Sequence, residues 1–495
     1  MSRPAILIAS NRGPVSFVPD EEGELQPKRG AGGLVTALTG ALEIAGGLWI
    51  ASAMSEGDRQ QVERSPSGRI EVLAEDVKFD LRYLAPSPET FERYYNVISN
   101  RVLWFLQHYL WDTVRSPRFG AATREAWEDY IRVNRMFAEA LAEEGSALEV
   151  PPAYLVQDYH LALVPGMLRE RRPEAAVAHF SHTPFADPTY LRVLPDYMSG
   201  ALVRGMLGAD VLGFQSEAWA ENFLLCCRAL PEVAVDLRRR RVTVDGRQVS
   251  VHVYPISVDV DSLRELEAEP DVRRTRRDIA RWRDDARMIL RVDRSELSKN
   301  ILRGFLAYET LLQRYPQWRG RVKHLAHITP SRREIPEYRA YTRECLATVE
   351  RINGELGTED WQPIEVRLKD DYRGAVAAYG LYDVLIVNPV FDGMNLVSME
   401  GPSVNRRNGV LILSRNAGAH SILGQHALGV NPFDVGEMAD AIHRALIMTD
   451  EERASRARGL RRVIRANPIA RWVERQLDDL QRAVAARGAG PPSLQ

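Results

Sequence analysis

The sequence has little cysteine. Cys226, Cys227 and Cys345 are the only three in 495 residues, too few for a disulfide framework, and no Cys-x-x-Cys pair suggests zinc. Free cysteine is usually buried. We therefore expect three buried thiols and neither a bound metal nor another cofactor.

Long apolar runs and a strong net charge are absent as well. No 18 uncharged apolar residues follow one another, and the first ten residues lack the charged and apolar regions of a secretory signal. The 65 basic and 67 acidic side chains give a formal net charge of -2, so no global field favours nucleic acid or an anionic membrane. We expect a cytoplasmic protein that binds neither, and that holds any anion with local groups.

The length predicts two large domains, and short apolar runs alternate with helical patterns in both halves. A hairpin signal at 244–247 closes the first half, and the alternation restarts after Tyr254-Pro255. The expected strands are 5–10, 48–51, 153–156 and 176–180, then 288–292, 322–328, 364–368, 384–388 and 410–414. This pattern predicts an α/β protein with two Rossmann-like doubly wound sheets. We place the domains at 1–256 and 257–471, followed by a helix at 472–487 and a disordered tail at 488–495.

Glycines follow the first strand. Arg12 lies in the run 10–14, and Gly30-Ala31-Gly32-Gly33 precedes a helix that we expect near Leu34. Glycine lets the backbone approach a phosphate, and a helix N-terminus favours the phosphate charge. Such a turn is often only a turn, so this signal is weak by itself.

Polar residues end two later strands of the first domain. Asp158 and His160 follow the strand at 153–156, and His182 follows the strand at 176–180. Ligands bind at the carboxyl ends of doubly wound strands, where polar groups can contact sugar hydroxyls. For His160 a buried structural histidine is an equal alternative, whereas the position of His182 before a proline turn favours function.

Two cations end the first strand of the second domain. Arg294 and Lys299 are five positions apart, so a strand-to-helix loop can turn both toward one phosphate. Fixed cations stabilise the charge that develops on a leaving nucleoside diphosphate. The alternative, a surface pair bridged to Asp293 and Glu296, needs no strand end.

A further strand ends in an unusual glycine turn. Asp392 can accept hydrogen bonds from sugar hydroxyls, and the amides around 394–397 can meet phosphate. Glu400 follows two helical turns later, where a carboxylate can hold a ribose. The turn therefore favours a nucleotide-sugar site over an exposed helix carboxylate.

Taken in order, these motifs resemble the trehalose-6-phosphate synthases, and the match spans about Ile6 to Trp472. The resemblance rests on Ser-Asn-Arg at 10–12, Tyr-Tyr-Asn at 94–96, Val-Leu-Trp at 102–104, Asp-Tyr-His at 158–160, His-Thr-Pro-Phe at 182–185, Gly-Phe-Gln at 213–215, Tyr-Pro-Ile at 254–256, the spacing of Arg294 and Lys299, and Asp-Gly-Met-Asn-Leu-Val at 392–397.

The resemblance implies a GT-B fold, with two domains facing a cleft and the last helix returning to the first domain. It also implies metal-free, retaining transfer of glucose from a nucleoside diphosphate glucose to glucose 6-phosphate, with a homo-oligomer left open. The implied catalytic residues are Asp158, His182, Arg294, Lys299 and Asp392. The implied donor residues are Gly32, Gly33, Arg294, Lys299, Leu368, Asp392, Gly393, Met394, Asn395, Leu396, Val397 and Glu400. The implied acceptor residues are Arg12, Tyr95, Trp104, Asp158 and Arg332.

The sequence also departs from the family pattern. Arg-Leu-Asp-Tyr-Ser-Lys-Gly becomes Arg-Ser-Glu-Leu-Ser-Lys-Asn at 294–300, Ala186 replaces a proline, and Gly-Pro follows Glu400. Uridine, guanosine and adenosine donors all stay open, although the 293–300 segment is similar to the actinobacterial branch, in which guanosine donors occur. Glycerol 3-phosphate or an aminocyclitol phosphate is an alternative acceptor. A catalytically silent sugar-phosphate sensor is the alternative from another class.

Overall fold

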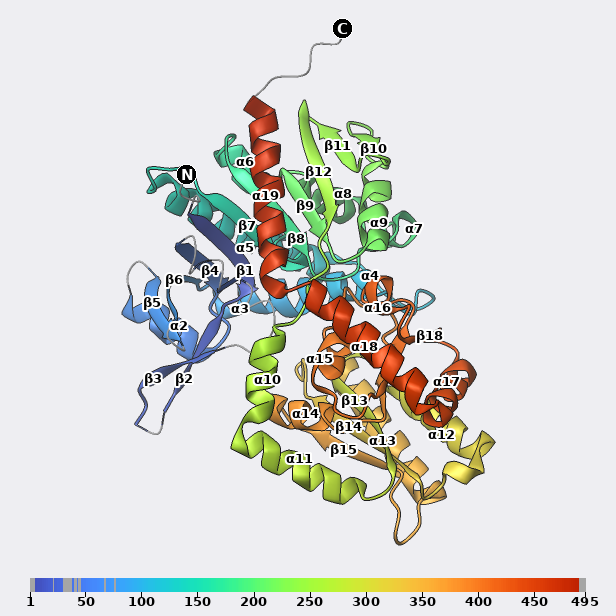
Figure 1. Cartoon of the computed structure of the whole chain (residues 1–495). Coiled ribbons are helices and arrows are strands. Elements are labelled where there is room, and N and C mark those ends of the chain that lie inside the picture. Colours follow the sequence, from blue (N-terminus) through green and yellow to red (C-terminus); the bar gives the residue numbers. More distant parts are fainter. Residues whose placement is uncertain are drawn as a thin grey trace. The chain divides into compact units, whose positions relative to one another are not determined.

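The structure, a computed structural model, describes residues 5–20, 22–29, 38–39, 42, 46–65, 68–74 and 77–488. The chain divides into two compact units (Figure 1). Unit 1 runs to Ile256 and includes the segment from Ile469, and unit 2 is Ser257–Pro468. The sequence placed this boundary at 256 and the return of the chain at 472. The last helix continues to Gly488, one residue into the predicted tail, and the rest of that tail lies outside the described residues.

Unit 1 is built on a ten-stranded sheet in the order β10-β11-β12-β9-β8-β7-β1-β4-β6-β5. Its central strands are parallel, while β5, β10 and β11 pair antiparallel at the edges. Along the parallel part, the order β6-β4-β1-β7-β8-β9 is the 3-2-1-4-5-6 order of a doubly wound sheet. The strands are β1 (Ile6–Arg12), β4 (Gly47–Ser52), β5 (Arg69–Ala74), β6 (Val77–Leu84), β7 (Ala153–Gln157), β8 (Ala176–Ser181), β9 (Val211–Phe214), β10 (Ala234–Asp236), β11 (Arg241–Val244) and β12 (Arg247–Val253).

The predicted hairpin at 244–247 is confirmed, because β11 and β12 pair around Asp245 and Gly246, which both have positive φ. A second hairpin, of β2 (Val15–Pro19) and β3 (Leu25–Arg29), was not predicted. Unit 1 also contains an 11-residue π-helix, Arg93–Leu103, and the short 3-10 turn Tyr159–Leu161. The α-helices of unit 1 are α2 (Glu56–Arg64), α3 (Pro88–Glu92), α4 (Trp104–Gln107), α5 (Ala121–Ser146), α6 (Val164–Arg171), α7 (Pro188–Leu191), α8 (Asp196–Met206), α9 (Glu217–Cys227) and α19 (Ile469–Gly488).

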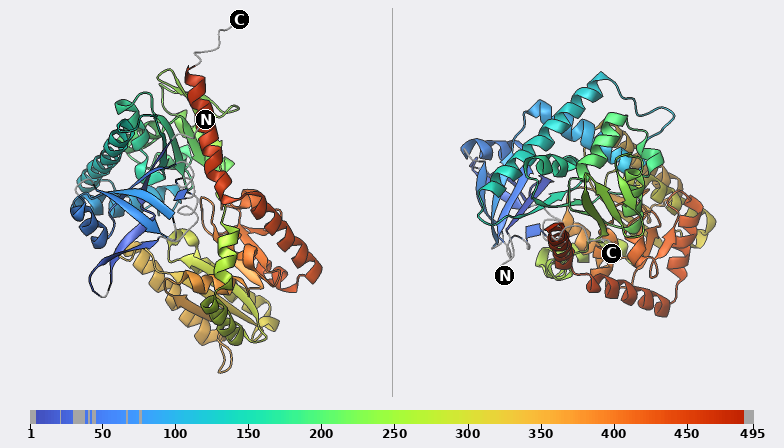
Figure 2. Two further views of the ribbon diagram at one scale, coloured as in Figure 1. Left: turned by 60° about the vertical axis from the view of Figure 1, so that its left-hand side comes forward. Right: turned by 90° about the horizontal axis from the view of Figure 1, so that it is seen from above.

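The last helix, α19, lies against β8, β9 and β12 of unit 1 (Figures 1 and 2). Its first turn packs Trp472 against Phe180 of β8, with ring centres 4.8 Å apart. Further along, Asp479 accepts a hydrogen bond from the Tyr254 hydroxyl at 2.7 Å, and Arg487 pairs with the buried Asp210 at 3.2 Å. The last helix therefore belongs to unit 1, as the sequence placed it.

Unit 2 is a six-stranded, fully parallel sheet in the order β15-β14-β13-β16-β17-β18, which is again the 3-2-1-4-5-6 order. The strands are β13 (Arg287–Arg294), β14 (Val322–Thr329), β15 (Ile364–Leu368), β16 (Val384–Val387), β17 (Val410–Ser414) and β18 (Leu428–Val430). The α-helices are α10 (Val260–Ala268), α11 (Pro270–Arg283), α12 (Ile301–Arg314), α13 (Pro336–Leu356), α14 (Tyr372–Tyr379), α15 (Val397–Val404), α16 (His420–Leu423), α17 (Val435–Ile447) and α18 (Asp450–Ala466), with 3-10 turns at Leu297–Lys299 and Pro316–Trp318. The predicted α/β class with two doubly wound sheets is confirmed.

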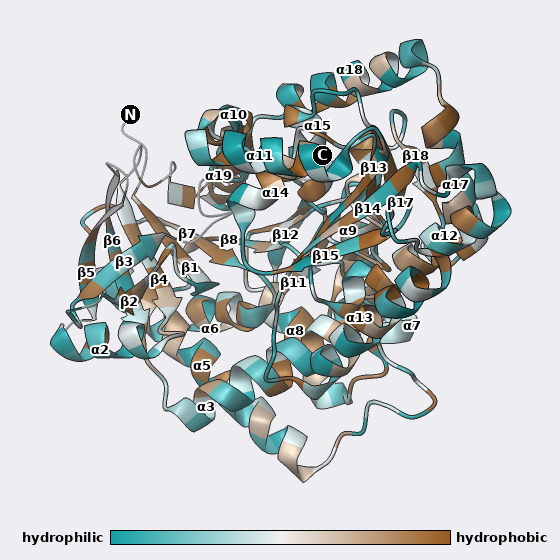
Figure 3. Ribbon diagram, turned by 90° about the horizontal axis from the view of Figure 1, so that it is seen from below, coloured by the Kyte–Doolittle hydropathy of each residue, from teal (hydrophilic) through white to brown (hydrophobic). Residues whose placement is uncertain are grey.

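The core of unit 2 follows from the apolar strand runs. Ile289, Ala326, Ile386 and Ile412 of the strands pack on the helical layer of α12, α13 and α17, which contributes Phe305 among others. Figure 3 shows the apolar colouring concentrated on the strands and on inward helix faces. None of the helices within the described ranges is both long and apolar enough to cross a bilayer.

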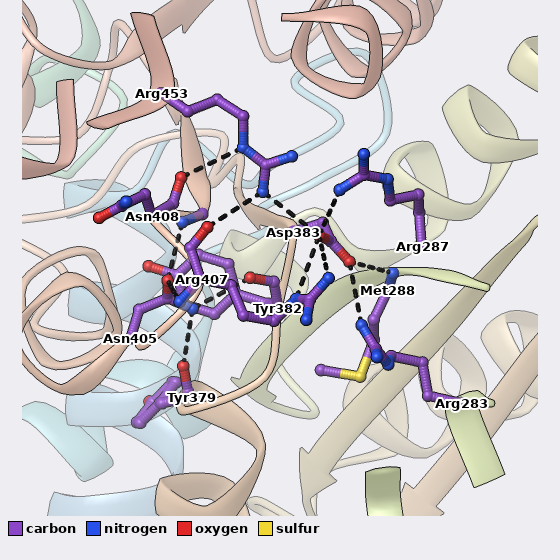
Figure 4. A network of polar contacts seen from close by, with 11 residues as sticks. Arg283, Arg287, Met288, Tyr379, Tyr382, Asp383, Asn405, Arg407, Asn408 and Arg453 are labelled. Atoms are coloured by element: carbon purple, nitrogen blue, oxygen red, sulfur yellow. Dashed lines mark hydrogen bonds and ion pairs between the residues drawn. The ribbon is translucent and has the colours of Figure 1, made fainter. Parts of the chain in front are cut away.

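At the amino ends of the strands, a buried carboxylate ties unit 2 together (Figure 4). Asp383, 1% exposed, precedes β16 and is approached by Arg283, Arg287, Arg407 and Arg453. It also accepts the Met288 amide hydrogen at 2.9 Å. Burial raises the pKa of this carboxyl, but the amide hydrogen bond and the arginines outweigh burial and lower it. This network holds the amino ends of β13 and β16 together. The candidate site described below lies at the carboxyl ends of the strands.

Candidate functional site

Each sheet has a switch point, where the strand order reverses and ligands of doubly wound folds bind. In unit 1 it lies between β1 and β7, which end at Arg12 and Gln157; in unit 2 it lies between β13 and β16, which end at Arg294 and Val387. We call the residues Arg12, Tyr95, Trp104, Asp158 and His182 the unit 1 site. The unit 2 site comprises Arg294, Lys299, Arg332, Leu368, the turn Asp392–Val397, and Glu400.

The unit 1 site is centred on Asp158. This residue follows β7 with φ of 72° and ψ of 170°, a backbone conformation that occurs almost only at glycine and is therefore strained here. Its Oδ1 accepts the backbone amide hydrogen of His182 at 3.0 Å. The two residues that the sequence placed at neighbouring strand ends are therefore in direct contact.

The His182 ring is held by neutral neighbours. Its Nε2 lies 3.0 Å from Gln157 Oε1, and the rings of Phe180 and Trp472 lie 4.7 Å and 5.6 Å away. Burial lowers the pKa of His182 to about 3, with a smaller contribution from His179. The imidazole is therefore uncharged at neutral pH.

The aromatic residues of the unit 1 site come from the π-helix and the turn that follows it. Tyr95 stacks between Phe91 and His160, at 5.3 Å and 5.9 Å, and His160 Nδ1 lies 3.9 Å from Asp158 Oδ2. π-helical turns often occur at functional sites, and this one brings Tyr95 into the same group of contacts as Asp158.

The remaining residues predicted for unit 1 differ in exposure. Trp104 is buried, 8% exposed, and stacks on His108 at 3.9 Å, whereas Arg12 is exposed at the end of β1. The predicted phosphate-binding glycines Gly32 and Gly33 lie outside the described residues.

In unit 2, Lys299 is paired with Asp392. The Lys299 Nζ lies 2.5 Å from Asp392 Oδ2, and Asn395 Nδ2 donates to the same oxygen at 3.0 Å. Lys299 is placed by the 3-10 turn after β13, which ends in left-handed Asn300 before α12. Asp392 follows β16, so the pair spans the switch point.

Arg294 and Arg332 are arranged around a buried carboxylate. Glu296, 0% exposed, lies 3.0 Å from Arg294 Nη1 and accepts a hydrogen bond from Ser331 Oγ at 2.9 Å. Burial raises the pKa of Glu296, but Arg294, Arg332 and Lys299 outweigh burial and lower the pKa to about 2. Arg332 also donates to the Tyr338 hydroxyl at 2.6 Å. Glu296 is thus ionised at neutral pH, pairs with Arg294 and interacts electrostatically with Arg332.

A second buried carboxylate was missed as a site residue by the sequence. Asp293 pairs with Arg291, which is fully buried, at 2.7 Å, and Arg291 also donates to the Lys299 carbonyl at 3.2 Å. Burial raises the pKa of Asp293 to about 6, although Arg291 and Lys299 lower it. Only its place at the end of β13 could have indicated a role.

The turn 392–397 is fixed by its neighbours. Gly418 donates its amide hydrogen to the Asp392 carbonyl at 3.1 Å, Ala419 donates to the Met394 carbonyl at 3.0 Å, and Asn395 has φ of 77°. A side chain at Gly418 would collide with the Gly393 carbonyl. Leu396 is the N-cap of α15 and Val397 its first residue, and no described residue accepts their amide hydrogens. The turn can therefore present amide donors at a helix N-terminus, as anion sites do.

Glu400 accepts hydrogen bonds from two tyrosines of α14. Tyr379 donates to Oε2 at 2.9 Å and Tyr372 to Oε1 at 3.3 Å. Burial raises the pKa of Glu400, partly offset by these bonds. The tyrosines were not predicted as partners of Glu400, although their spacing of seven places them on one helix face.

Leu368 ends β15, is 36% exposed, and lines a pocket of about 550 Å³. The other lining residues are Ser295, Pro330, Ser331, Arg333, Tyr338, Arg339, Thr342 and Arg343. The pocket thus adjoins the loop that carries Arg294. Within the part of the chain that the structure describes, no three His, Cys, Asp or Glu side chains are grouped so as to hold a metal ion.

Comparison with known proteins gives consistent matches. The model of glycosyltransferase family 20 matches residues 4–482. Trehalose-6-phosphate synthase of Klebsiella pneumoniae is 34% identical, over 97% of this chain and 95% of its own. Validamine 7-phosphate valienyltransferase of Streptomyces hygroscopicus is 32% identical, over 99% and 97%. The E. coli trehalose-6-phosphate structure bound with UDP-2-fluoro glucose superposes with a TM-score of 0.83 at 31% identity, covering 96% of this chain and 98% of its own.

Proposed function

Because the chain belongs to glycosyltransferase family 20, we propose that it is an α,α-trehalose-6-phosphate synthase. It transfers glucose, with retention, from a nucleoside diphosphate glucose to glucose 6-phosphate, and needs no metal or other cofactor. The family and the GT-B class predicted from the motifs are confirmed, and the protein is a glycosyltransferase. The three free, buried cysteines fit a reducing compartment such as the cytoplasm.

The observation that carries this proposal is the Lys299–Asp392 pair at the switch point of unit 2. Lys299 and Arg294 bind the donor diphosphate, helped by the amides of Leu396 and Val397, and Glu400 binds the ribose hydroxyls. Asp392, Met394 and Asn395 contact the glucose. These contacts leave a cation next to the oxygen on which negative charge develops.

The unit 1 site contributes the acceptor contacts. Arg12 binds the phosphate of glucose 6-phosphate, because guanidinium groups bind phosphate through paired donors. Tyr95 and Trp104 also contact this phosphate. Asp158 contacts the acceptor sugar, and His182 the transferred glucose.

In the reaction, the bond between glucose C1 and the diphosphate oxygen breaks, and a bond from C1 to the acceptor hydroxyl oxygen forms on the same face. The hydroxyl proton passes to the leaving diphosphate. The protein supplies position and charge rather than a covalent nucleophile.

A panel assay tests the proposal. Uridine, guanosine and adenosine diphosphate glucose are each incubated with glucose 6-phosphate, and released nucleoside diphosphate and trehalose 6-phosphate are measured. Product from at least one donor is expected. If no donor yields trehalose 6-phosphate, the proposal is wrong.

Valienyl transfer to an aminocyclitol phosphate is a second candidate, favoured by one observation: the 32% identity with validamine 7-phosphate valienyltransferase extends over 99% of the chain. The same assay with validamine 7-phosphate and a nucleoside diphosphate valienol as substrates distinguishes the two. Transfer to validamine 7-phosphate, without transfer to glucose 6-phosphate, would favour the second candidate.

A further inference from the structure

The His182 ring is constrained more tightly than its place in a strand-end loop requires. Its backbone amide is bonded to Asp158, and its ring contacts Phe180, Trp472 and the side chain of Gln157. Phe180 is 0% exposed and Trp472 3% exposed. These neighbours fix where both ring nitrogens point.

Gln157 is the polar member of this set. It is the last residue of β7, 1% exposed, and its Oε1 lies 3.0 Å from His182 Nε2. A carboxamide oxygen can only accept a hydrogen bond. The hydrogen of a neutral imidazole must therefore lie on Nε2 when it faces this oxygen, which leaves a lone pair on Nδ1.

We propose that Gln157 is a positioning residue that holds His182 in the Nε2–H tautomer, so that Nδ1 acts as a fixed hydrogen-bond acceptor for a hydroxyl group of the transferred sugar. The inference rests on the proposed function, which takes His182 to contact that sugar. It adds the direction of the hydrogen bond and the residue that sets it.

The direction matters for specificity. An acceptor on the protein favours a ligand hydroxyl, which can donate, and disfavours a carbonyl, ether or phosphate oxygen, which cannot. The charged or titratable groups near the ring are Asp158, whose Oδ1 is bonded to the His182 amide, and His179. Burial holds the pKa of both imidazoles at about 3, so the acceptor persists through the physiological range.

Nitrogen-15 NMR of the full chain labelled at histidine tests the tautomer without any substrate. His182→Asn identifies the His182 signals among those of the ten histidines. The expected spectrum at pH 7 has a protonated Nε2 and an unprotonated Nδ1. A protonated Nδ1, or rapid exchange between tautomers, would overturn the inference.

Two variants test the role of Gln157. Gln157→Met keeps a similar length but no acceptor, so the tautomers should mix and kcat should fall about tenfold, as when one hydrogen bond is lost. Binding of the free nucleoside diphosphate, which lacks the transferred glucose, should be unchanged. Gln157→Glu keeps an oxygen in place and should restore the Nε2–H tautomer at pH 8. An unchanged tautomer and kcat in Gln157→Met would contradict the assignment.

Gln215→Met is a matched control. Gln215 is also 1% exposed, just after β9, and its Oε1 accepts the Ile256 amide hydrogen at 2.9 Å. This variant should lower stability but leave the His182 tautomer as it is. An Nε2–H tautomer in a protein that transfers no sugar would sink the proposed function and leave the tautomer assignment standing.

Discussion

At the switch points of their sheets, the two units hold their site residues by different physical means. In unit 1 the contacts are hydrogen bonds to the backbone or to a neutral amide, together with aromatic rings, and His182 is uncharged. In unit 2 the cations are held by ion pairs, Lys299 with Asp392 and Arg294 with Glu296, and Glu400 is held by neutral hydroxyl groups. The strand order at both sites is 3-2-1-4-5-6, so the difference comes from the loops and not from the fold.

This difference matches the chemistry that each site is proposed to serve. Charge develops on a leaving diphosphate, so preorganised cations are useful in unit 2. Sugar hydroxyls are neutral donors and acceptors, so unit 1 gains more from fixed directions than from charge. A single substitution that removes a charge at the unit 2 site should therefore lower kcat more than a single substitution at the unit 1 site.

The largest effect is expected for Lys299→Ala. It removes the cation that faces Asp392 and should lower kcat by about 10² or more, as the loss of a transition-state charge contact does. Steady-state kinetics with the productive donor measure this. Circular dichroism should show the fold unchanged.

Lys323→Ala is the matched control for this variant. Lys323 lies on β14, toward the amino ends of the strands, where it donates to the Trp282 carbonyl at 2.7 Å. Its replacement should leave kcat within about twofold, since it is remote from the switch point. An equal fall in kcat in both variants would show that the charge of Lys299 contributes no more to turnover than a lysine far from the site.

The next effect concerns stability. Glu296→Gln removes a carboxylate with a folded pKa of about 2, below its ordinary 4.5. Its stabilisation is present above pH 4.5 and is lost as the pH falls toward 2, so the variant should lose about 3 kcal/mol at pH 7 and little at pH 2, since one pKa unit corresponds to about 1.4 kcal/mol. Urea unfolding at a series of pH values measures this.

Glu355→Gln controls for the loss of a negative charge. Glu355 is exposed on α13 and pairs with Arg351 at 3.0 Å. An exposed pair contributes little, so its replacement should change stability by under about 1 kcal/mol at any pH. A Glu296→Gln variant with the same small loss would contradict the ion-pair account of unit 2.

The pH dependence of turnover should follow unit 2. Protonation of Asp293 near pH 6 would weaken its pair with Arg291, which donates to the Lys299 carbonyl. We expect kcat/KM to fall below pH 6, approaching tenfold per pH unit. This fall in kcat/KM on the acidic side of the pH profile should vanish in Asp293→Asn. It should persist in His182→Asn, because His182 has a pKa of about 3. If the acidic fall in kcat/KM were lost only in His182→Asn, the pH dependence would come from unit 1 and not from unit 2.

Much of this arrangement was predictable from the sequence because strand ends are local signals. The apolar runs before Asp158, His182, Arg294 and Asp392 located the carboxyl ends of four strands, two in each unit, and the parallel strands of one sheet have their carboxyl ends on the same side of that sheet. The class of each side chain then indicated its chemistry. The antiparallel edge strands, such as β5 and β10, were missed because they lack a continuous apolar run.

Pairing was less predictable than position. Lys299 and Asp392 are 93 residues apart, and nothing in the sequence sets their distance. The alternative interpretation of Arg294, a surface ion pair, named Glu296 correctly as its partner. Because Glu296 is buried, however, this ion pair belongs to the site and not to the surface. The partners of Glu400 and His182, namely Tyr372, Tyr379 and Gln157, lie on other elements, so only tertiary structure reveals them.

The smallest expected effect, in unit 1, is that of Asp158→Asn. Asparagine has the same shape as aspartate, so it adds no strain at this backbone position, and its side-chain oxygen can still accept the His182 amide hydrogen. Only the charge is lost. A fall of about fivefold in kcat is expected, near the net worth of one hydrogen bond, with unchanged affinity for the nucleoside diphosphate. Asp245→Asn, at a surface turn with φ of 48°, should have no effect. A loss as large as that of Lys299→Ala would mean that unit 1 also works through charge, and that the contrast between the two sites is only structural.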